Sequence, residues 1–269
     1  MAAGLGTRFL PITKSIPKEM LPVGNKPVLQ YIVEEMADSG IEEIMIVIAK
    51  GKELIRDYFS RDKKLEKVLE KQGKLELLGS LTKLLERVKF SYAYQKAPLG
   101  NGHALLPAKK FCGKDVFAFS EGDSVIAGAG PAIGQLLQVF QERGGPVIGV
   151  QKIDDKQAMT RYGNVYGKPV SDGVYQVEKF EEKPSIENVS PHGLIVGGMR
   201  YIFTPDIWQE LSACKKGRGG EIWLADAANN LAKKAAFYAL AYEGKYLDTG
   251  RVESWLETNE YFFDKQYVV

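Results

Sequence analysis

Apolar positions in the first half of the chain alternate between a helical and a strand spacing. Val28, Ile32 and Met36 lie three or four residues apart, which predicts a helix from Pro27 to Gly40. The unbroken apolar run at 44–48 predicts a strand buried on both faces. Further helical patterns cover 52–59, 62–71, 74–86, 102–111 and 131–141, and strand patterns cover 88–94, 116–120 and 146–151. This alternation predicts an α/β fold with a mixed, mostly parallel central sheet and helices on both faces.

The pattern changes after residue 151. Strand patterns at 174–180 and 194–203 are longer and typical of antiparallel pairing, whereas 163–165 reads as a loop. Helices are expected from about 204, at 221–231 and at 252–262. We therefore expect one domain, 1–269, with halves 1–151 and 152–269.

Composition and charge narrow the class of protein. The 269 residues are 45% hydrophobic, enough for a substantial core, and the formal net charge of +2 gives no basic field for nucleic acid. Cys112 and Cys214 are far apart, so we expect neither a disulfide framework nor a zinc site. No apolar run is long enough to span a bilayer. We expect a cytoplasmic protein without a membrane or nucleic-acid partner.

Two glycines near the N-terminus suggest a phosphate-binding loop. Gly4 and Gly6 precede Thr7, and a glycine lets backbone N–H groups approach a ligand closely. A dinucleotide fingerprint would need a third glycine where Phe9 stands, and no Gly-Lys pair is followed by Ser or Thr, which excludes a P-loop. Arg8, Lys14 and Lys18 add three cations behind the glycines. Taken alone, such glycines more often form a surface turn, and such cations a solvated face.

Two aspartates lie where an α/β sheet exposes its ligand crevice. Asp123 follows the strand at 116–120, and Asp248 lies between a strand-like run and a helix. Two carboxylates that converge on a triphosphate would suit Mg²⁺, which takes its remaining ligands from phosphate and water. For Asp123 the alternative is a cap for the following helix. Neither His103 nor His192 has metal-ligand spacing, which fits a phosphoryl-type transfer without a general base.

The whole N-terminal string carries a family resemblance. It reads A-A-G-L-G-T-R-F-L-P-I-T-K-S-I-P-K-E-M-L-P and resembles the signature of the sugar-1-phosphate nucleotidylyltransferases, in particular the bacterial UTP-glucose-1-phosphate uridylyltransferases, or UDP-glucose pyrophosphorylases. The helical insertion predicted at 52–86 is similar to theirs. The resemblance implies a Rossmann-like nucleotide-diphospho-sugar transferase fold, with nucleotide bound by 1–151 and sugar by 152–269. It also implies a homo-oligomer, a dimer or tetramer.

The resemblance also implies a reaction and a set of site residues. UTP and glucose 1-phosphate would give UDP-glucose and pyrophosphate with Mg²⁺ as cofactor. Gln95 and Gly100 would read the base, Gly163 and Glu182 would hold the sugar, and Lys183 would hold the sugar phosphate. The full set comprises the catalytic Arg8, Lys18 and Lys183, the substrate-binding Ala2, Ala3, Gly4, Gly6, Thr7, Lys14, Gln95, Gly100, Gly163 and Glu182, and the metal ligands Asp123 and Asp248.

The sequence departs from the family pattern at several places. The family has an apolar strand before the glycine loop, whereas here Met1 directly precedes Ala2; a misassigned start, a truncated gene and a true variant are the alternatives. We expect unpaired edges on the neighbouring strands and a looser phosphate loop. Asn101, Ser124, Asn164 and Trp223 also replace the usual residues. A thymidylyltransferase or another nucleotidylyltransferase acting on a hexose 1-phosphate, and a non-catalytic sugar-nucleotide-binding paralogue, are the rival functions.

Overall fold

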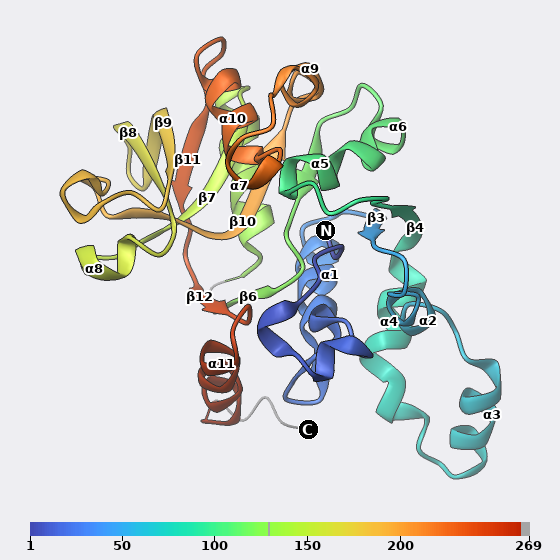
Figure 1. Ribbon diagram of the computed structural model, residues 1–269. Helices are drawn as coiled ribbons and strands as arrows, with labels where there is room; N and C mark the ends of the chain where they lie inside the picture. Colours follow the sequence, from blue (N-terminus) through green and yellow to red (C-terminus); the bar gives the residue numbers. More distant parts are fainter. Residues whose placement is uncertain (129, 265–269) are drawn as a thin grey trace.

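The computed structural model describes residues 1–128 and 130–264 (Figure 1). The predicted first helix is present as α1 (Val28–Asp38), which buries Val28, Ile32 and Val33. It begins after Pro27 and is followed by Gly40 at a φ of 84°, as the proline and glycine signals predict. The other α-helices are α2 (Leu54–Tyr58), α3 (Lys63–Lys71), α4 (Gly79–Arg87), α5 (Asn101–Leu105), α6 (Lys109–Cys112), α7 (Ala132–Arg143), α8 (Lys156–Met159), α9 (Ile207–Ala213), α10 (Leu224–Ala232) and α11 (Val252–Asp264).

The largest sheet has six strands in the order β5-β10-β7-β11-β9-β8. These strands are β5 (Phe117–Phe119), β7 (Val147–Lys152), β8 (Gly163–Ser171), β9 (Val174–Glu182), β10 (Leu194–Phe203) and β11 (Tyr238–Ala241). Three two-stranded sheets accompany it, formed by β1 (Pro22–Val23) with β2 (Lys26–Pro27), β3 (Glu43–Ile48) with β4 (Lys89–Tyr94), and β6 (Ser124–Ala127) with β12 (Lys245–Asp248).

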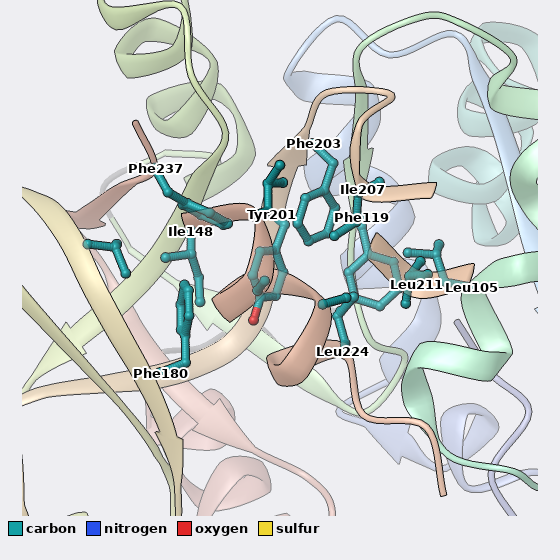
Figure 2. Packing of buried hydrophobic residues seen from close by; sticks show 14 of the residues in the cluster. Leu105, Phe119, Ile148, Phe180, Tyr201, Phe203, Ile207, Leu211, Leu224 and Phe237 are labelled. Atoms are coloured by element: carbon teal, nitrogen blue, oxygen red, sulfur yellow. The ribbon is translucent and has the colours of Figure 1, made fainter. Parts of the chain in front are cut away.

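Helices cover both faces of the large sheet, as predicted. Successive residues of β10 point to opposite faces: Tyr201 and Phe203 join the cluster packed by α9 and α10, whereas Ile202 joins the cluster packed by α7. Figure 2 shows the first cluster, in which Phe119, Phe203 and Phe237 pack together with Leu224 of α10. The mixed α/β class is therefore confirmed.

The described part of the large sheet is mainly antiparallel, so the prediction of a mostly parallel central sheet was wrong. Parallel pairing is found between β3 and β4 and between β7 and β11, while the other strands of the large sheet pair antiparallel. The sequence 163–165, expected as a loop, begins β8, which forms a long hairpin with β9. This hairpin and the insertion of β10 between β5 and β7 bring antiparallel strands into the sheet. Local spacing along a strand does not reveal either event, because pairing is decided between distant segments.

The predicted helical insertion is also present. The segment 52–87 holds α2, α3 and α4 and extends away from the large sheet (Figure 1, lower right). Asp62 caps α3 by accepting hydrogen bonds from the amides of Lys64 and Leu65. None of the residues of α3 is buried, which agrees with its charged sequence. Across the described residues, no helix is both long and apolar enough to cross a membrane.

An apolar groove separates β3 from β5. Within the described residues β3 pairs in a ladder with β4 alone, and β5 pairs with β10 alone. Met1 and Ala2 lie at one end of this gap, where the Ala2 amide donates to the Val47 carbonyl at 2.8 Å. The rest of the gap is a cavity of about 330 Å³, lined largely by apolar side chains of α1, β3, β5 and the helices after residue 100. The expected unpaired strand edges are therefore confirmed.

The N-terminal amine itself is buried at this groove. The Met1 ammonium donates to the Ser120 carbonyl at 2.7 Å. Burial removes its hydration and lowers its pKa to about 6. The first residues thereby hold the start of the glycine loop between the ends of β3 and β5.

Candidate active site

The glycine loop is a set of short turns with unused amides. It runs through η1 (Thr7–Phe9), η2 (Ile12–Lys14) and η3 (Lys18–Met20), all of them 3-10 helices. Gly6 has a φ of 68°, and its carbonyl accepts a hydrogen bond of 2.8 Å from the Thr13 hydroxyl. Within the part of the chain that the structure describes, the amides of Gly4, Gly6 and Thr7 donate to no other group. Such free donors suit phosphate oxygens.

Lys18 connects this loop to the predicted metal ligand Asp123. Its ammonium forms an ion pair with the Asp123 carboxylate and lies 3.8 Å from the position of a Cβ placed on Gly4. Burial disfavours the ammonium, but Asp123 and Glu19 outweigh this effect and raise the pKa of Lys18. The side chain is therefore charged at neutral pH and lies beside the loop amides.

A second ion pair supports the Lys18 turn and was not predicted. Glu19 is 1% exposed, and both of its carboxylate oxygens accept from the Lys52 ammonium, at 2.8 and 3.0 Å. Burial lowers the pKa of Lys52 despite this partner. The K-E-M-L-P motif places Glu19 in the sequence, but no local signal indicates its partner 33 residues later.

The two predicted metal ligands lie side by side. Strand β12 pairs with β6 so that Asp248 is opposite Ser124, and the Thr249 amide donates to the Asp123 carbonyl at 3.2 Å. A Cβ placed on Gly250 would lie 3.0 Å from Asp248 Oδ1 and 3.5 Å from Asp123 Oδ2. Two aspartates separated by 125 positions therefore converge on one point.

Arg8 reaches the same point from the glycine loop. Its Nη1 lies 3.7 Å from that Cβ position and donates to the Gly250 carbonyl at 3.4 Å. The predicted residues Arg8, Lys18, Asp123 and Asp248 thus form one cluster. Figure 1 shows the N-terminal loop next to β6, β12 and α11.

This cluster fits a divalent ion that takes part of its ligands from a substrate. The Asp248 carboxylate is oriented by the Gly250 amide at 2.8 Å and the Ser254 hydroxyl at 3.2 Å. Among the described residues, no three His, Cys, Asp or Glu side chains are grouped closely enough to hold a metal by themselves. Two carboxylates with further ligands from phosphate and water are the usual arrangement for Mg²⁺.

Glu121 is a further acid near Asp123 and Asp248, and the sequence analysis did not assign it a role. Its side chain lines the same cavity as Asp123 and Asp248. Burial, with repulsion from Asp123, raises the pKa of Glu121 to about 8. Its place two residues before Asp123 at a strand end was a usable signal.

The predicted sugar-site residues line a cavity of about 470 Å³ beside the cluster. Gly163 of β8 lies opposite Glu182 of β9, and a Cβ on this glycine would come within 3.0 Å of Glu182 Oε2. Lys183 has a φ of 49°, its amide donates to the Tyr162 carbonyl at 3.2 Å, and its ammonium lies 3.7 Å from Glu182. The cavity is also lined by Arg161, Tyr246 and Arg251, which the sequence analysis did not single out.

Of the two predicted base-reading residues, Gln95 lines a second cavity of about 530 Å³, and Gly100 is its hydrogen-bond partner. Ala3, Leu5 and Gln95 contribute to its lining. Gln95 Nε2 donates to the Gly100 carbonyl at 3.2 Å and lies 3.2 Å from His103 Nδ1, so this histidine orients the glutamine amide.

Gly100 has a structural reason to be glycine. Its φ is 97°, and a Cβ there would lie 2.6 Å from the Ile222 carbonyl oxygen. The next residue, Asn101, accepts a hydrogen bond from the Leu224 amide at 2.9 Å and so caps α10. The unusual asparagine therefore supports a helix.

The remaining predicted residues differ in burial. Ala2 and Ala3 are 1% and 4% exposed and anchor the loop beside β3, whereas Lys14 is exposed at the end of η2. The structure brings Lys14 into no contact with the acids in the described residues. A role for Lys14 stays a prediction.

Comparison with known proteins agrees with this geometry. The nucleotidyl transferase family model matches residues 1–265. The chain is 43% identical over 257 residues to UTP–glucose-1-phosphate uridylyltransferase 2 of Staphylococcus saprophyticus, covering 96% of this chain and 88% of that protein. A uridylyltransferase of Staphylococcus epidermidis is 42% identical with the same coverage.

The chain is also similar in structure to solved UDP-glucose pyrophosphorylases. An apo UDP-glucose pyrophosphorylase superposes with a TM-score of 0.94 at 35% identity, covering 98% of this chain and 97% of the other. The UTP-bound enzyme of Acinetobacter baumannii superposes with a TM-score of 0.88 at 32% identity, covering 99% and 92%. From the matched family model and these relatives, the chain belongs to the nucleotidyl transferase family.

Proposed function

We propose that this protein transfers a uridylyl group from UTP to glucose 1-phosphate, releasing pyrophosphate and forming UDP-glucose. The observation that carries the proposal is the convergence of Arg8, Lys18, Asp123 and Asp248. Arg8 and both aspartates line the cavity of about 470 Å³ that also holds the predicted sugar-site residues, and a second cavity of about 530 Å³ lies at Ala3 and Gln95. The relatives at 42–43% identity are uridylyltransferases, and one structural neighbour is a UDP-glucose pyrophosphorylase complexed with UDP-glucose.

The nucleotide is held along the N-terminal loop. Its base enters the cavity at Ala3 and Gln95, where the glutamine amide both donates and accepts on the uracil edge. The free amides of Gly4, Gly6 and Thr7 donate to phosphate oxygens. The triphosphate then lies against the cluster of Arg8 and Lys18.

The sugar phosphate enters from the other cavity. Glu182 accepts hydrogen bonds from hexose hydroxyls, and Gly163 lets the chain approach the ring closely. Lys183 attracts the phosphate and aligns its oxygen with the α-phosphorus of UTP. Because this nucleophile is already an anion, no general base is needed, and catalysis consists of positioning and charge neutralisation.

Charge on the leaving pyrophosphate grows during the reaction. Arg8 and Lys18 are fixed cations beside it and stabilise that charge more in the transition state than in the ground state. Asp123 and Asp248 would hold a divalent ion, for which we propose Mg²⁺, and the bound ion would neutralise phosphate oxygens. A homo-oligomeric state and a cytoplasmic location stay predictions.

A nucleotide panel tests the proposal. UTP, dTTP, ATP and GTP are each incubated with glucose 1-phosphate and Mg²⁺, and pyrophosphate release is measured. We expect UTP to be the preferred donor by at least tenfold. Preference for dTTP would assign the thymidylyl reaction, and binding of UDP-glucose without pyrophosphate release would assign a binding protein.

A further inference from the structure

A fully buried arginine lies directly behind the two acids. Arg200 of β10 is 0% exposed, and its guanidinium forms an ion pair with Glu35 of α1. Its Nε and Nη2 donate to Glu35 Oε2 at 2.9 and 2.7 Å, and Nε also donates to Oε1 at 3.2 Å. Its remaining donors reach Ser124, whose carbonyl and hydroxyl each accept at 3.2 Å. The planar, five-donor guanidinium is suited to joining several acceptors at fixed angles.

Ser124 is the residue through which this contact can act on the site. It follows Asp123 directly and is the β6 partner of Asp248 in the β6–β12 ladder. Arg200 therefore binds a residue that is joined to both acids. Glu35 extends the contact further, because its Oε1 accepts from the Ile133 amide at the start of α7.

An irregularity in β10 aims Arg200 at Ser124. The register of β10 against β7 shifts between Val196 and Tyr201, and Gly198 and Met199 have φ values of 74° and 44°. The Gly198 carbonyl accepts from Arg200 Nη1 at 2.6 Å, while Met199 lines the sugar-side cavity. A strand bulge with a left-handed non-glycine residue is a costly feature that is common beside active sites.

We propose that Arg200 and Glu35 are positioning residues that set the separation of Asp123 and Asp248, and thereby the affinity of the site for a divalent ion with nucleotide. This inference rests on the proposed function. The ion pair joins α1, β6 and β10, so its loss lets β6 move and changes the separation of the two carboxylates, although neither aspartate is itself substituted. Groups that orient metal ligands typically change metal affinity 10–100-fold when they are removed.

The test measures metal binding directly. Arg200→Met, Arg200→Lys and Glu35→Gln are compared with the wild-type protein by titrating Mn²⁺ in the presence of UTP and following the free ion by electron paramagnetic resonance. We expect Arg200→Met and Glu35→Gln to bind Mn²⁺ at least tenfold more weakly. Arg200→Lys keeps a charge but loses the planar fork, so we expect it to recover only part of the affinity.

A matched control separates this role from general stability. Glu210 is another buried carboxylate in an ion pair, with Lys234 at 2.6 Å, and it lies on α9 outside the cavity lining. Glu210→Gln is expected to bind Mn²⁺ as the wild type does. Equal weakening in Glu210→Gln, or normal binding in both Glu35→Gln and Arg200→Lys, overturns the proposal.

Hydrogen exchange of the metal-free protein distinguishes this inference from the proposed function. We expect Glu35→Gln to speed amide exchange in β6 and β12 while exchange in β8 and β9 is unchanged. If wild-type protein transfers no uridylyl group, the proposed function fails, and the exchange result still decides whether the ion pair holds the strands. Unchanged exchange in β6 and β12 overturns the positioning role.

Discussion

The acids of the cleft lie on paired strands, whereas the cations that face them lie on short turns. Asp123 and Asp248 are carried at the ends of β6 and β12, whose four-residue ladder joins segments about 120 positions apart. Arg8 and Lys18 belong to 3-10 helices of three residues each, held by contacts such as Thr13 to Gly6. The acid side is thus fixed by the core and the cation side by local turns.

This difference suggests a division of tasks. A metal site needs ligands at fixed separations, which paired strands supply. A phosphate loop needs free backbone amides, which short turns leave unused and regular strands and helices do not. In the described part of the chain, the two sides are in contact through the ion pair of Lys18 with Asp123 and the hydrogen bond of Arg8 to the Gly250 carbonyl. Substitutions on the acid side should therefore cost most activity.

The largest effect is expected from Asp248→Asn. The substitution keeps the size of the side chain but removes its charge, so we expect kcat to fall by about 10²–10³, the range seen when one electrostatic contact to a transition state is lost. Turnover is measured by pyrophosphate release at saturating substrates. Asp206→Asn, at an aspartate hydrogen-bonded to Thr204, is the control and should be neutral. Near-normal turnover of Asp248→Asn would show that the acid side does not hold the reacting phosphates.

Lys18→Ala should cost somewhat less, because Arg8 remains on the same side. We expect turnover to fall by about 10²-fold, since a charge that stabilises the leaving pyrophosphate is lost. Lys18→Arg keeps the positive charge and should recover part of the lost turnover. Lys26→Ala, which removes a lysine paired with Glu34 near the same loop, is the control. A Lys18→Ala enzyme within threefold of wild type would contradict the assignment.

The same contrast explains what the sequence could predict. The glycines and cations of the N-terminal loop could be picked out from the sequence because they lie within twenty positions and act through local turns, although their roles stay predictions. The position of each acid near a strand end could be predicted, but their meeting depends on the β6–β12 ladder, which the sequence pattern did not predict. A four-residue strand with a distant partner has too little periodicity to be recognised.

Buried partners were missed for the same reason. Arg200 occurs within a strand pattern, and nothing beside it in the chain indicates Glu35, 165 positions earlier. Lys52 with Glu19 is a similar case. The α/β class, most helices and the insertion at 52–87 were predicted because helical periodicity and glycine or proline boundaries are local. The order of strands in the large sheet was not predicted, because it is decided by pairing between segments far apart in the sequence.

Lys183→Ala tests the sugar side, where the effect should be smaller. The Lys183 side chain is 55% exposed, so solvent screens part of its attraction to phosphate. We expect KM for glucose 1-phosphate to rise by about tenfold, the lower end for a charged hydrogen bond, while KM for UTP changes little. Lys179→Ala, on the same strand hairpin but outside the cavity lining, is the control. Equal changes in both KM values would place Lys183 outside the sugar-phosphate contact.

The smallest effect, on stability alone, is expected from Glu121→Gln. Burial and Asp123 raise the pKa of Glu121 to about 8, against an ordinary glutamate value near 4.3 in the unfolded chain. Between these values the folded state binds more protons than the unfolded state, so the free energy of unfolding of the metal-free protein falls as the pH rises from about 5 to 8. Glutamine cannot ionise, so the free energy of unfolding of the variant should fall less than that of the wild type between pH 5 and pH 8. Urea unfolding at pH 5 and pH 8 measures it, and an identical decline in both proteins would show that the carboxyl is already ionised beside Lys18.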